Sequence, residues 1–168
     1  KELSLNKIMP TLIAEYEEKK QKQNIYHYKG MEGIKTVLRD INNYKEYDAF
    51  GISSNLGKIV PFYFPHWVRE RKEKKLFGRM IKTEDDKLGT PALVGLESYK
   101  KMFHVKEVPK EFYTPAATFI YGNKVAILLE EAENAVAVVI ENKDIAEGYR
   151  KQFMAMWDSA KEENMDIY

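Results

Sequence analysis

The stretch that decides the fold is Ala117-Thr-Phe-Ile-Tyr121, Gly122-Asn123 and Lys124-Val-Ala-Ile-Leu-Leu-Glu130, followed by Ala135-Val-Ala-Val-Val-Ile-Glu141. Apolar runs of this length and continuity are typical of strands that are covered on both faces. Glycine and asparagine both tolerate a positive φ, so the Gly122-Asn123 pair predicts a tight hairpin turn between the first two runs. The sequence therefore predicts three strands at the core of a sheet.

A long helix is predicted directly after these strands, from Lys143 to about Lys161. Asn142 fits the N-cap position, and Asp144 places a negative charge in the first turn. One broad apolar stripe with helical spacing follows, made of Ile145, Tyr149, Phe153, Met156, Trp157 and Ala160. This stripe is expected to pack on the sheet.

Upstream of the hairpin, strand-like and helix-like segments alternate. The predicted strands are 24–29, 48–53, 76–82 and 104–108. One predicted helix ends near Ile41, and another starts at Thr90-Pro91 with inward-facing Leu93, Leu96, Tyr99 and Phe103. The segment between Pro61 and Pro65 is predicted to be a loop or a broken helix. This alternation favours a three-layer α/β domain with a mixed β-sheet.

Composition limits the classes of function. The chain has 168 residues, 44% of them hydrophobic and 32% charged, with a net charge of +1. This balance is typical of a globular chain, and no global field favours nucleic acid or an anionic membrane. No apolar run reaches the length of a membrane span, and no signal peptide is visible. Cysteine is absent, which excludes disulfides and thiolate metal sites and favours a cytoplasmic location.

The first residues show a second helical stripe. Its members are Leu5, Ile8, Met9, Leu12, Ile13 and Tyr16. One interpretation is that the stripe packs on the domain, and the other is a connecting helix that pairs with a second subunit. Because the chain begins with lysine, we expect it to be a piece of a longer protein. The predicted organisation is a linker and dimerisation helix over 1–23 and a domain over 24–168.

No catalytic or metal-binding constellation can be recognised in the sequence. The three histidines, His27, His66 and His104, are dispersed and match no metal-ligand spacing. There is no Gly-x-Ser-x-Gly elbow, and the acidic run 84–86 does not match a calcium loop and is interpreted as a solvated loop. The sequence therefore predicts no enzyme, no metal and no cofactor.

Candidate ligand-binding residues lie where strands end. Hydroxyl and free backbone N–H groups at such a place can bind an anionic or polyol ligand, and the same residues can equally be plain helix caps. Since ligands of open α/β sheets bind at the carboxyl ends of strands, we expect a pocket there. The candidates are Ser53, Ser54, Asn55, Thr114, Thr118 and Tyr121.

The final strands and helix resemble the end of a phospholipase D-like domain. The resemblance covers Thr118–Ile127, Asn134–Ala146 and the helix with Phe153 and Trp157. Members of that superfamily carry His-x-Lys-x-x-x-x-Asp around the first strand, where histidine is the nucleophile. In one register these positions hold Thr114, Ala116 and Tyr121, and in the other they hold Pro115, Ala117 and Gly122. The resemblance therefore implies a catalytically inactive relative.

Nearly the whole chain resembles the C-terminal domain of TrmB-like transcriptional regulators. The matching stretches are Met9–Leu12, Tyr26–Ile41, Phe50–Ser54, Tyr63–Pro65, Phe119–Ile127 and Val138–Ala146. The resemblance implies an upstream winged helix-turn-helix that contacts DNA, a linker helix that forms a homodimer, and a domain that senses a small molecule. Characterised members respond to sugars.

Three functions stay open at this point. The first is an effector-binding and dimerisation domain of a TrmB-like regulator, with no membrane contact and with DNA bound only by the upstream domain. The second is a phospholipase D-type phosphodiesterase with an altered motif. The third is a purely structural dimerisation domain without a ligand.

Overall fold

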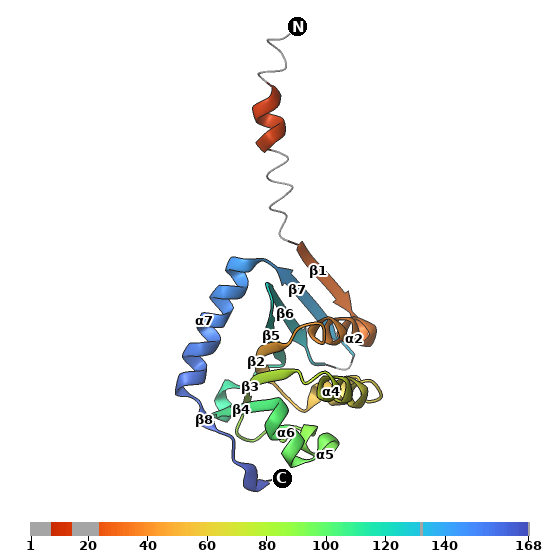
Figure 1. Cartoon of the computed structure of the whole chain (residues 1–168), viewed down its shortest axis with the longest axis vertical. Coiled ribbons are helices and arrows are strands. Elements are labelled where there is room, and N and C mark those ends of the chain that lie inside the picture. Colours follow the sequence, from red (N-terminus) through yellow and green to blue (C-terminus); the bar gives the residue numbers. More distant parts are fainter. Residues whose placement is uncertain (1–7, 15–23, 132, 168) are drawn as a thin grey trace.

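The computed structural model describes residues 8–14, 24–131 and 133–167. In that part of the chain, one mixed sheet has the strand order β1-β7-β6-β5-β2-β3-β4-β8 (Figure 1). The strands are β1 (Asn24–Lys29), β2 (Glu46–Ile52), β3 (Phe77–Thr83), β4 (Phe103–Val108), β5 (Ala116–Tyr121), β6 (Lys124–Leu129), β7 (Val136–Glu141) and β8 (Lys161–Glu162). The helices of the domain are α2 (Gly30–Ile41), α3 (Asn55–Ile59), α4 (Phe64–Glu73), α5 (Thr90–Val94), α6 (Leu96–Met102) and α7 (Lys143–Ser159), with 3₁₀ turns at Lys110–Phe112 and Met165–Ile167.

Helices cover both faces of the sheet. On one face, Leu38 of α2, Trp67 of α4 and Tyr99 of α6 belong to a single buried cluster with β2 and β5. On the other face, Phe153 and Trp157 of α7 form a second cluster with side chains of β3, β5 and β6. Figure 1 shows α7 alone on its side of the sheet. The predicted three-layer α/β domain with a mixed sheet is confirmed.

The three apolar runs between Ala117 and Glu141 and the turn at Gly122-Asn123 fold as predicted. β5 and β6 pair antiparallel from Ala116 opposite Leu129 to Tyr121 opposite Lys124, so Gly122 and Asn123 form the turn. Gly122 has φ +52, which the turn requires. At the start of α7, the side chain of Asn142 accepts a hydrogen bond from the backbone N–H of Ile145 at 3.0 Å, which confirms the predicted N-cap.

One predicted helix is wrong in its continuity. The segment that starts at Thr90 breaks at Gly95, where φ is +76, into the short helices α5 and α6. Leu93 and Leu96 are therefore 45% and 40% exposed, and of the four side chains predicted to face inward only Tyr99 and Phe103 are buried, the latter as the first residue of β4. A positive φ at Gly95 cannot continue an α-helix, and this conformation is easily accessible to glycine.

β2 contains a bulge near its carboxyl end. β2 pairs with β3 in regular register up to Phe50, and the pairing then skips to Ile52. The skipped residue, Gly51, has φ +66, and an added Cβ would lie 2.7 Å from Cγ2 of Thr114 and 2.8 Å from the carbonyl oxygen of Ala116. Both the backbone conformation and the space therefore require glycine here.

We expect Gly51→Ala to lower the free energy of unfolding by about 2 kcal/mol or more, because the strained φ and the contact with β5 act together. Gly148→Ala is the matched control, since Gly148 lies in α7 and an added Cβ there meets nothing within 4 Å. The control should raise stability by up to about 1 kcal/mol through helix propensity. Urea unfolding measures both, and equal stabilities for the two variants would contradict the bulge argument.

Candidate functional site

The topology brings five chain segments together at one edge of the sheet. β2, β3 and β4 run parallel, so their carboxyl ends share this edge. β5 is antiparallel to β2 and therefore begins here, while β6 is antiparallel to β5 and ends here. Ser53, Asp86, Thr114 and Glu130 follow or precede these strand ends. This is the edge at which open α/β sheets bind ligands.

A buried hydroxyl and a buried carboxyl group form the centre of this edge. Ser53 Oγ lies 2.6 Å from Glu130 Oε2 and accepts a hydrogen bond from the backbone N–H of Asn55 at 3.1 Å. Glu130 is only 5% exposed, and its Oε1 has no hydrogen-bond partner among the described residues. Burial raises the pKa of Glu130 to about 8; the hydrogen bond from Ser53 opposes this shift and the charge of Asp86 adds to it. The group is therefore mostly protonated at neutral pH.

Asp86 extends this network to the neighbouring strands. Its two carboxylate oxygens accept hydrogen bonds from the backbone N–H of Ser54 at 3.1 and 3.0 Å. The fully buried ammonium group of Lys82 donates to the backbone carbonyl of Asp86 and to Glu107 Oε1, both at 2.8 Å. The ends of β2, β3 and β4 are thus tied together by side chains.

A pocket of about 350 Å³ opens beside this network. Its walls come from the start of α3, the connection to α4, the first residues of α4, and the segment from Lys87 to Leu93. The polar residues of the lining are the hydroxyl-bearing Ser53, Ser54 and Thr90 and the two lysines Lys58 and Lys87. A smaller cavity of about 30 Å³ adjoins it, because Ser53, Phe64, Leu88 and Thr90 line both.

The six candidate residues from the sequence lie in three places. Ser53 and Ser54 line the pocket, and Asn55 begins α3 next to them. Thr114 lies at the same edge, where it packs against Gly51. Thr118 is buried in the middle of β5, opposite Phe50. Tyr121 is at the opposite edge of the sheet, so the structure brings together four of the six.

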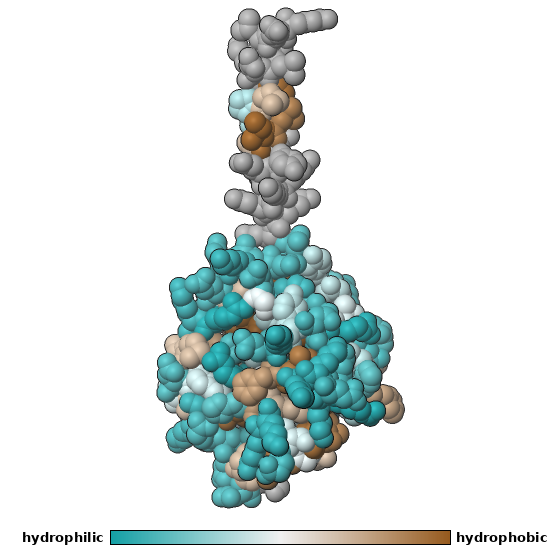
Figure 2. Space-filling model, viewed as in Figure 1, coloured by the Kyte–Doolittle hydropathy of each residue, from teal (hydrophilic) through white to brown (hydrophobic). Residues whose placement is uncertain are grey.

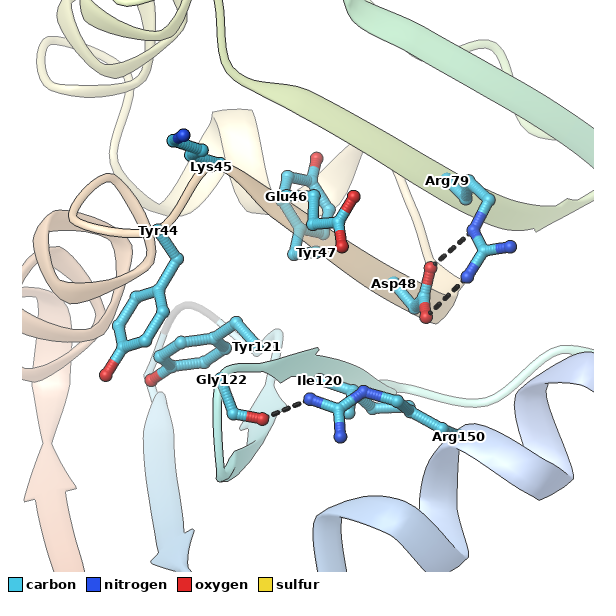
Figure 3. Close-up of a pocket in the computed structure, with 10 residues that line it drawn as sticks. All are labelled: Tyr44, Lys45, Glu46, Tyr47, Asp48, Arg79, Ile120, Tyr121, Gly122 and Arg150. Atoms are coloured by element: carbon cyan, nitrogen blue, oxygen red, sulfur yellow. Dashed lines mark hydrogen bonds and ion pairs between the residues drawn. The ribbon is translucent and has the colours of Figure 1, made fainter. Parts of the chain in front are cut away.

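The opposite edge has a polar cleft of about 340 Å³ (Figure 3). Within it Arg79 forms a two-point ion pair with Asp48, with Nε–Oδ1 2.7 Å and Nη2–Oδ2 2.9 Å. Arg150 of α7 donates to the carbonyl oxygen of Gly122. Because both guanidinium groups already bind protein acceptors, this cleft is a weaker candidate for an anion site.

Tyr121 has a structural role at this opposite edge. Its hydroxyl donates to Asp40 Oδ2 at 3.1 Å, and Lys124 Nζ lies 2.7 Å from the same oxygen. Burial, reinforced by Asp40, raises the pKa of Tyr121. The tyrosine therefore stays protonated and links α2 to the hairpin.

Two acidic residues of the network, Glu130 and Asp86, were not among the residues predicted from the sequence. Glu130 is the last residue of an apolar run that is predicted to be a buried strand. Its position could therefore have indicated a buried carboxyl group. Asp86 was assigned to a solvated loop; Glu84 and Asp85 of that run are exposed, but Asp86 is half-buried and caps the end of β2. No sequence pattern distinguishes the third acidic residue from the first two.

The residues with catalytic potential do not converge. His27 is on β1, His66 on α4 and His104 on β4, where its Nε2 lies 3.0 Å from Glu162 Oε2. Among the described residues, no group of three or more acidic or histidine side chains could hold a metal ion. Within the same ranges, no helix is long and apolar enough to cross a membrane.

Comparison with known proteins places the fold. No protein-family model matches the chain, and no curated protein does. Among solved structures, TrmBL2, an archaeal chromatin protein whose structure shows a novel mode of DNA binding, matches with a TM-score of 0.59 and 12% identity. The match covers 96% of this chain, which spans only 64% of the TrmBL2 chain.

Two further structures match the domain at nearly their full length. Nuc from Salmonella typhimurium, a phospholipase D family member, has a TM-score of 0.59 and 14% identity, and the match covers 84% of this chain and 98% of Nuc. NucT from Helicobacter pylori has a TM-score of 0.60 and 10% identity, with 84% and 99% covered. The chain therefore has the phospholipase D-like fold, and in structure it is similar both to phospholipase D family members and to TrmBL2.

Proposed function

We propose that this chain is the effector-binding and dimerisation part of a TrmB-like transcriptional regulator, in which an upstream winged helix-turn-helix binds DNA. The observation that carries the proposal is the pocket at the carboxyl ends of β2 and β3, beside the buried pair Ser53 and Glu130. Its volume of about 350 Å³ lies within the range of small-molecule sites. The likeness to TrmBL2 supports the regulatory context.

An effector in this pocket contacts α3, α4 and the Lys87–Leu93 segment at once. In this proposal, these segments have two arrangements relative to β2. A ligand that binds one arrangement more tightly shifts the population toward it, by the ratio of its two affinities. That shift in turn controls DNA binding by the upstream domain.

The helix over residues 8–14 supplies the surface for dimerisation. Ile8, Met9, Leu12 and Ile13 lie on one face of it and are 48–52% exposed. In Figure 2 this helix shows a mainly hydrophobic surface, whereas the visible face of the domain is mostly hydrophilic. Leu5 and Tyr16, which the sequence assigned to the same stripe, lie outside the described residues. An apolar helical stripe of this kind is typical of a helix that pairs with a second copy.

Leu12→Asp is expected to convert the dimer of this chain into a monomer, because the buried charge in a helix pair has no partner. Thr11→Asp is the matched control, since Thr11 is exposed on the same helix outside the stripe and should leave the dimer intact. Analytical ultracentrifugation measures both. A wild-type chain that is monomeric at all accessible concentrations, or a Leu12→Asp dimer of unchanged affinity, would contradict the pairing.

Native mass spectrometry tests the effector site. The wild-type chain is incubated with a small-molecule cell extract, and its spectrum is compared with one recorded under denaturing conditions. We expect an added mass that disappears on denaturation and is absent in Gly89→Leu. Gly89 lines the pocket, has φ −68, and an added Cβ meets nothing within 4 Å, so the backbone accepts leucine and a bulky side chain is added at the pocket wall.

Gly148→Leu is the control for that experiment, because Gly148 on α7 is equally free of neighbours and lies away from the pocket. An added mass that survives in Gly89→Leu would place the ligand elsewhere. Bare chain mass in every spectrum would instead support the purely structural dimerisation domain.

A second candidate function is a phosphodiesterase of the phospholipase D class, which the likeness to Nuc supports. Thr114 lies just before β5 and Ala116 begins it, so in this register the motif positions hold a hydroxyl and a methyl group where the class has its nucleophile and its lysine. Bis(p-nitrophenyl) phosphate tests the candidate: turnover that is lost in His27→Ala or His104→Ala would establish an altered mechanism. Turnover unaffected by either variant would point to a contaminating enzyme.

A further inference from the structure

The charged residues that line the pocket have one sign. Lys58 and Lys87 are the charged residues of its lining, and both are exposed at its mouth. Lys58 Nζ donates one hydrogen bond to Asn55 Oδ1 at 3.1 Å, which leaves two of its three donors for a ligand. No carboxylate belongs to the lining, and the nearby Asp86 is already bound by the backbone N–H of Ser54. The mouth therefore favours an anionic group.

The interior of the pocket is apolar. Phe64, Leu88 and Leu93 supply most of the wall below the lysines, together with the rings of Pro61 and Pro65. Behind Ser53 and Thr90, the smaller cavity is surrounded by aromatic side chains, among them Tyr47, Trp67 and Phe119. At about 30 Å³, this cavity holds only a few non-hydrogen atoms. Its walls suit the end of an apolar chain.

The polar groups of the interior are too few for a sugar. Ser53, Ser54 and Thr90 bring one hydroxyl each, and that of Ser53 is already bonded to Glu130 and Asn55. A sugar ring has several hydroxyl groups, and each one that is buried without a partner costs free energy. Planar carboxylate and amide side chains, which bind pairs of hydroxyls, are absent from this lining. The pocket chemistry therefore favours a ligand with a single polar end.

We infer that the pocket binds a small amphipathic acid, a carboxylate attached to a short apolar chain. The inference rests on the proposed effector-binding function and names its ligand class. The carboxylate lies between Lys58 and Lys87, and the chain lies on Phe64 and Leu88 with its end directed past Ser53 and Thr90. The buried carboxyl group of Glu130 adds little negative charge at the deep end, since it is mostly protonated at neutral pH.

Hexanoate is the first probe, and two-dimensional NMR of the wild-type chain is the measurement. We expect a dissociation constant below about 1 mM, with resonance shifts centred on Ser53, Thr90 and Leu93. Affinity should rise about threefold to fourfold with each methylene from acetate upward, until the cavity is full. Hexanamide has the same chain without the charge, and we expect it to bind about tenfold more weakly.

The charge at the mouth is tested by the double variant Lys58→Gln with Lys87→Gln. It should weaken hexanoate binding about tenfold while leaving hexanamide unchanged. Lys72→Gln with Lys143→Gln is the matched control, because both residues are exposed and neither lines the pocket. The control should bind hexanoate like the wild type.

The outcomes separate this inference from the function on which it rests. If maltose binds in the pocket and hexanoate does not, the inference of an amphipathic acid is wrong, but the proposed effector-binding function is retained. Equal affinities for hexanoate and hexanamide, or shifts centred on Arg79 and Arg150 at the opposite edge, also overturn it. If no probe binds and the extract yields no pocket-dependent mass, both the inference and the proposed function fail.

Discussion

Glu130→Gln is expected to raise the free energy of unfolding at pH 8 by about 3–4 kcal/mol and to leave it nearly unchanged at pH 4. The side chain is 5% exposed, and burial raises its pKa from an ordinary value of 4.5 to about 8. Each unit of difference between folded and unfolded pKa corresponds to about 1.4 kcal/mol. Glutamine has the shape of the protonated acid and cannot ionise.

The direction of the pH effect follows from proton binding. Between about pH 4.5 and 8, the folded wild-type chain holds a proton on Glu130 that the unfolded chain has released. Wild-type stability therefore contains a term that is fully favourable below the unfolded pKa and is lost as the pH rises toward 8. In Glu130→Gln this term is absent, so the two stability curves should diverge across that range.

Urea unfolding at a series of pH values measures this divergence. Glu131→Gln is the matched control, because Glu131 is the next residue and is exposed. The control should follow the wild-type curve within about 0.5 kcal/mol. Parallel curves for Glu130→Gln and the wild type would show that the group ionises normally in the folded protein.

Arg71→Ala is expected to lower the free energy of unfolding by about 3–5 kcal/mol. Arg71 is fully buried, and its guanidinium carbon lies 4.4 Å from the ring centre of Tyr47 and 5.2 Å from that of Trp67. It donates to Asn42 Oδ1 at 3.2 Å and to the carbonyl oxygen of Phe77 at 2.9 Å. Alanine removes these contacts, leaves the buried Asn42 Oδ1 and the partly buried carbonyl oxygen of Phe77 without this donor, and opens a cavity.

The control for this prediction lies on the same helix. Arg69 is exposed on α4, and Arg69→Ala should change stability by no more than about 0.5 kcal/mol. Chemical denaturation followed by the fluorescence of Trp67 and Trp157 measures both variants. A loss below about 1 kcal/mol for Arg71→Ala would mean that burial of the cation costs as much as its contacts contribute.

The burial of Arg71 could not be predicted from the charge pattern of α4. The run Val68-Arg-Glu-Arg-Lys-Glu-Lys-Lys75 has alternating charges, which are typical of a solvated helix face. The structure agrees for Arg69 and Lys72, but Arg71 faces the sheet, where two aromatic rings and two oxygen acceptors are available. Apart from Trp67 on the same helix, these neighbours are Asn42 at the end of α2, Tyr47 on β2 and Phe77 on β3, so only the tertiary structure could reveal them.

The sequence alone determined the layers and the central hairpin of this protein. Long apolar runs, a Gly-Asn turn and an Asn N-cap depend on interactions within a few residues, and these local signals were sufficient for β5, β6, β7 and α7. The broken helix at Gly95 was missed because glycine tolerates both a helical and a positive φ.

The candidate site was decided by the tertiary structure. Ser53 could be proposed from its place after a strand, but its partner Glu130 lies 77 positions away, and Asp86 and Thr90 come from other connections. The order and direction of the strands place these residues at one edge of the sheet and place Tyr121 at the opposite edge. Burial then keeps Glu130 protonated, because the free energy of ionising a carboxyl group depends on the groups packed around it.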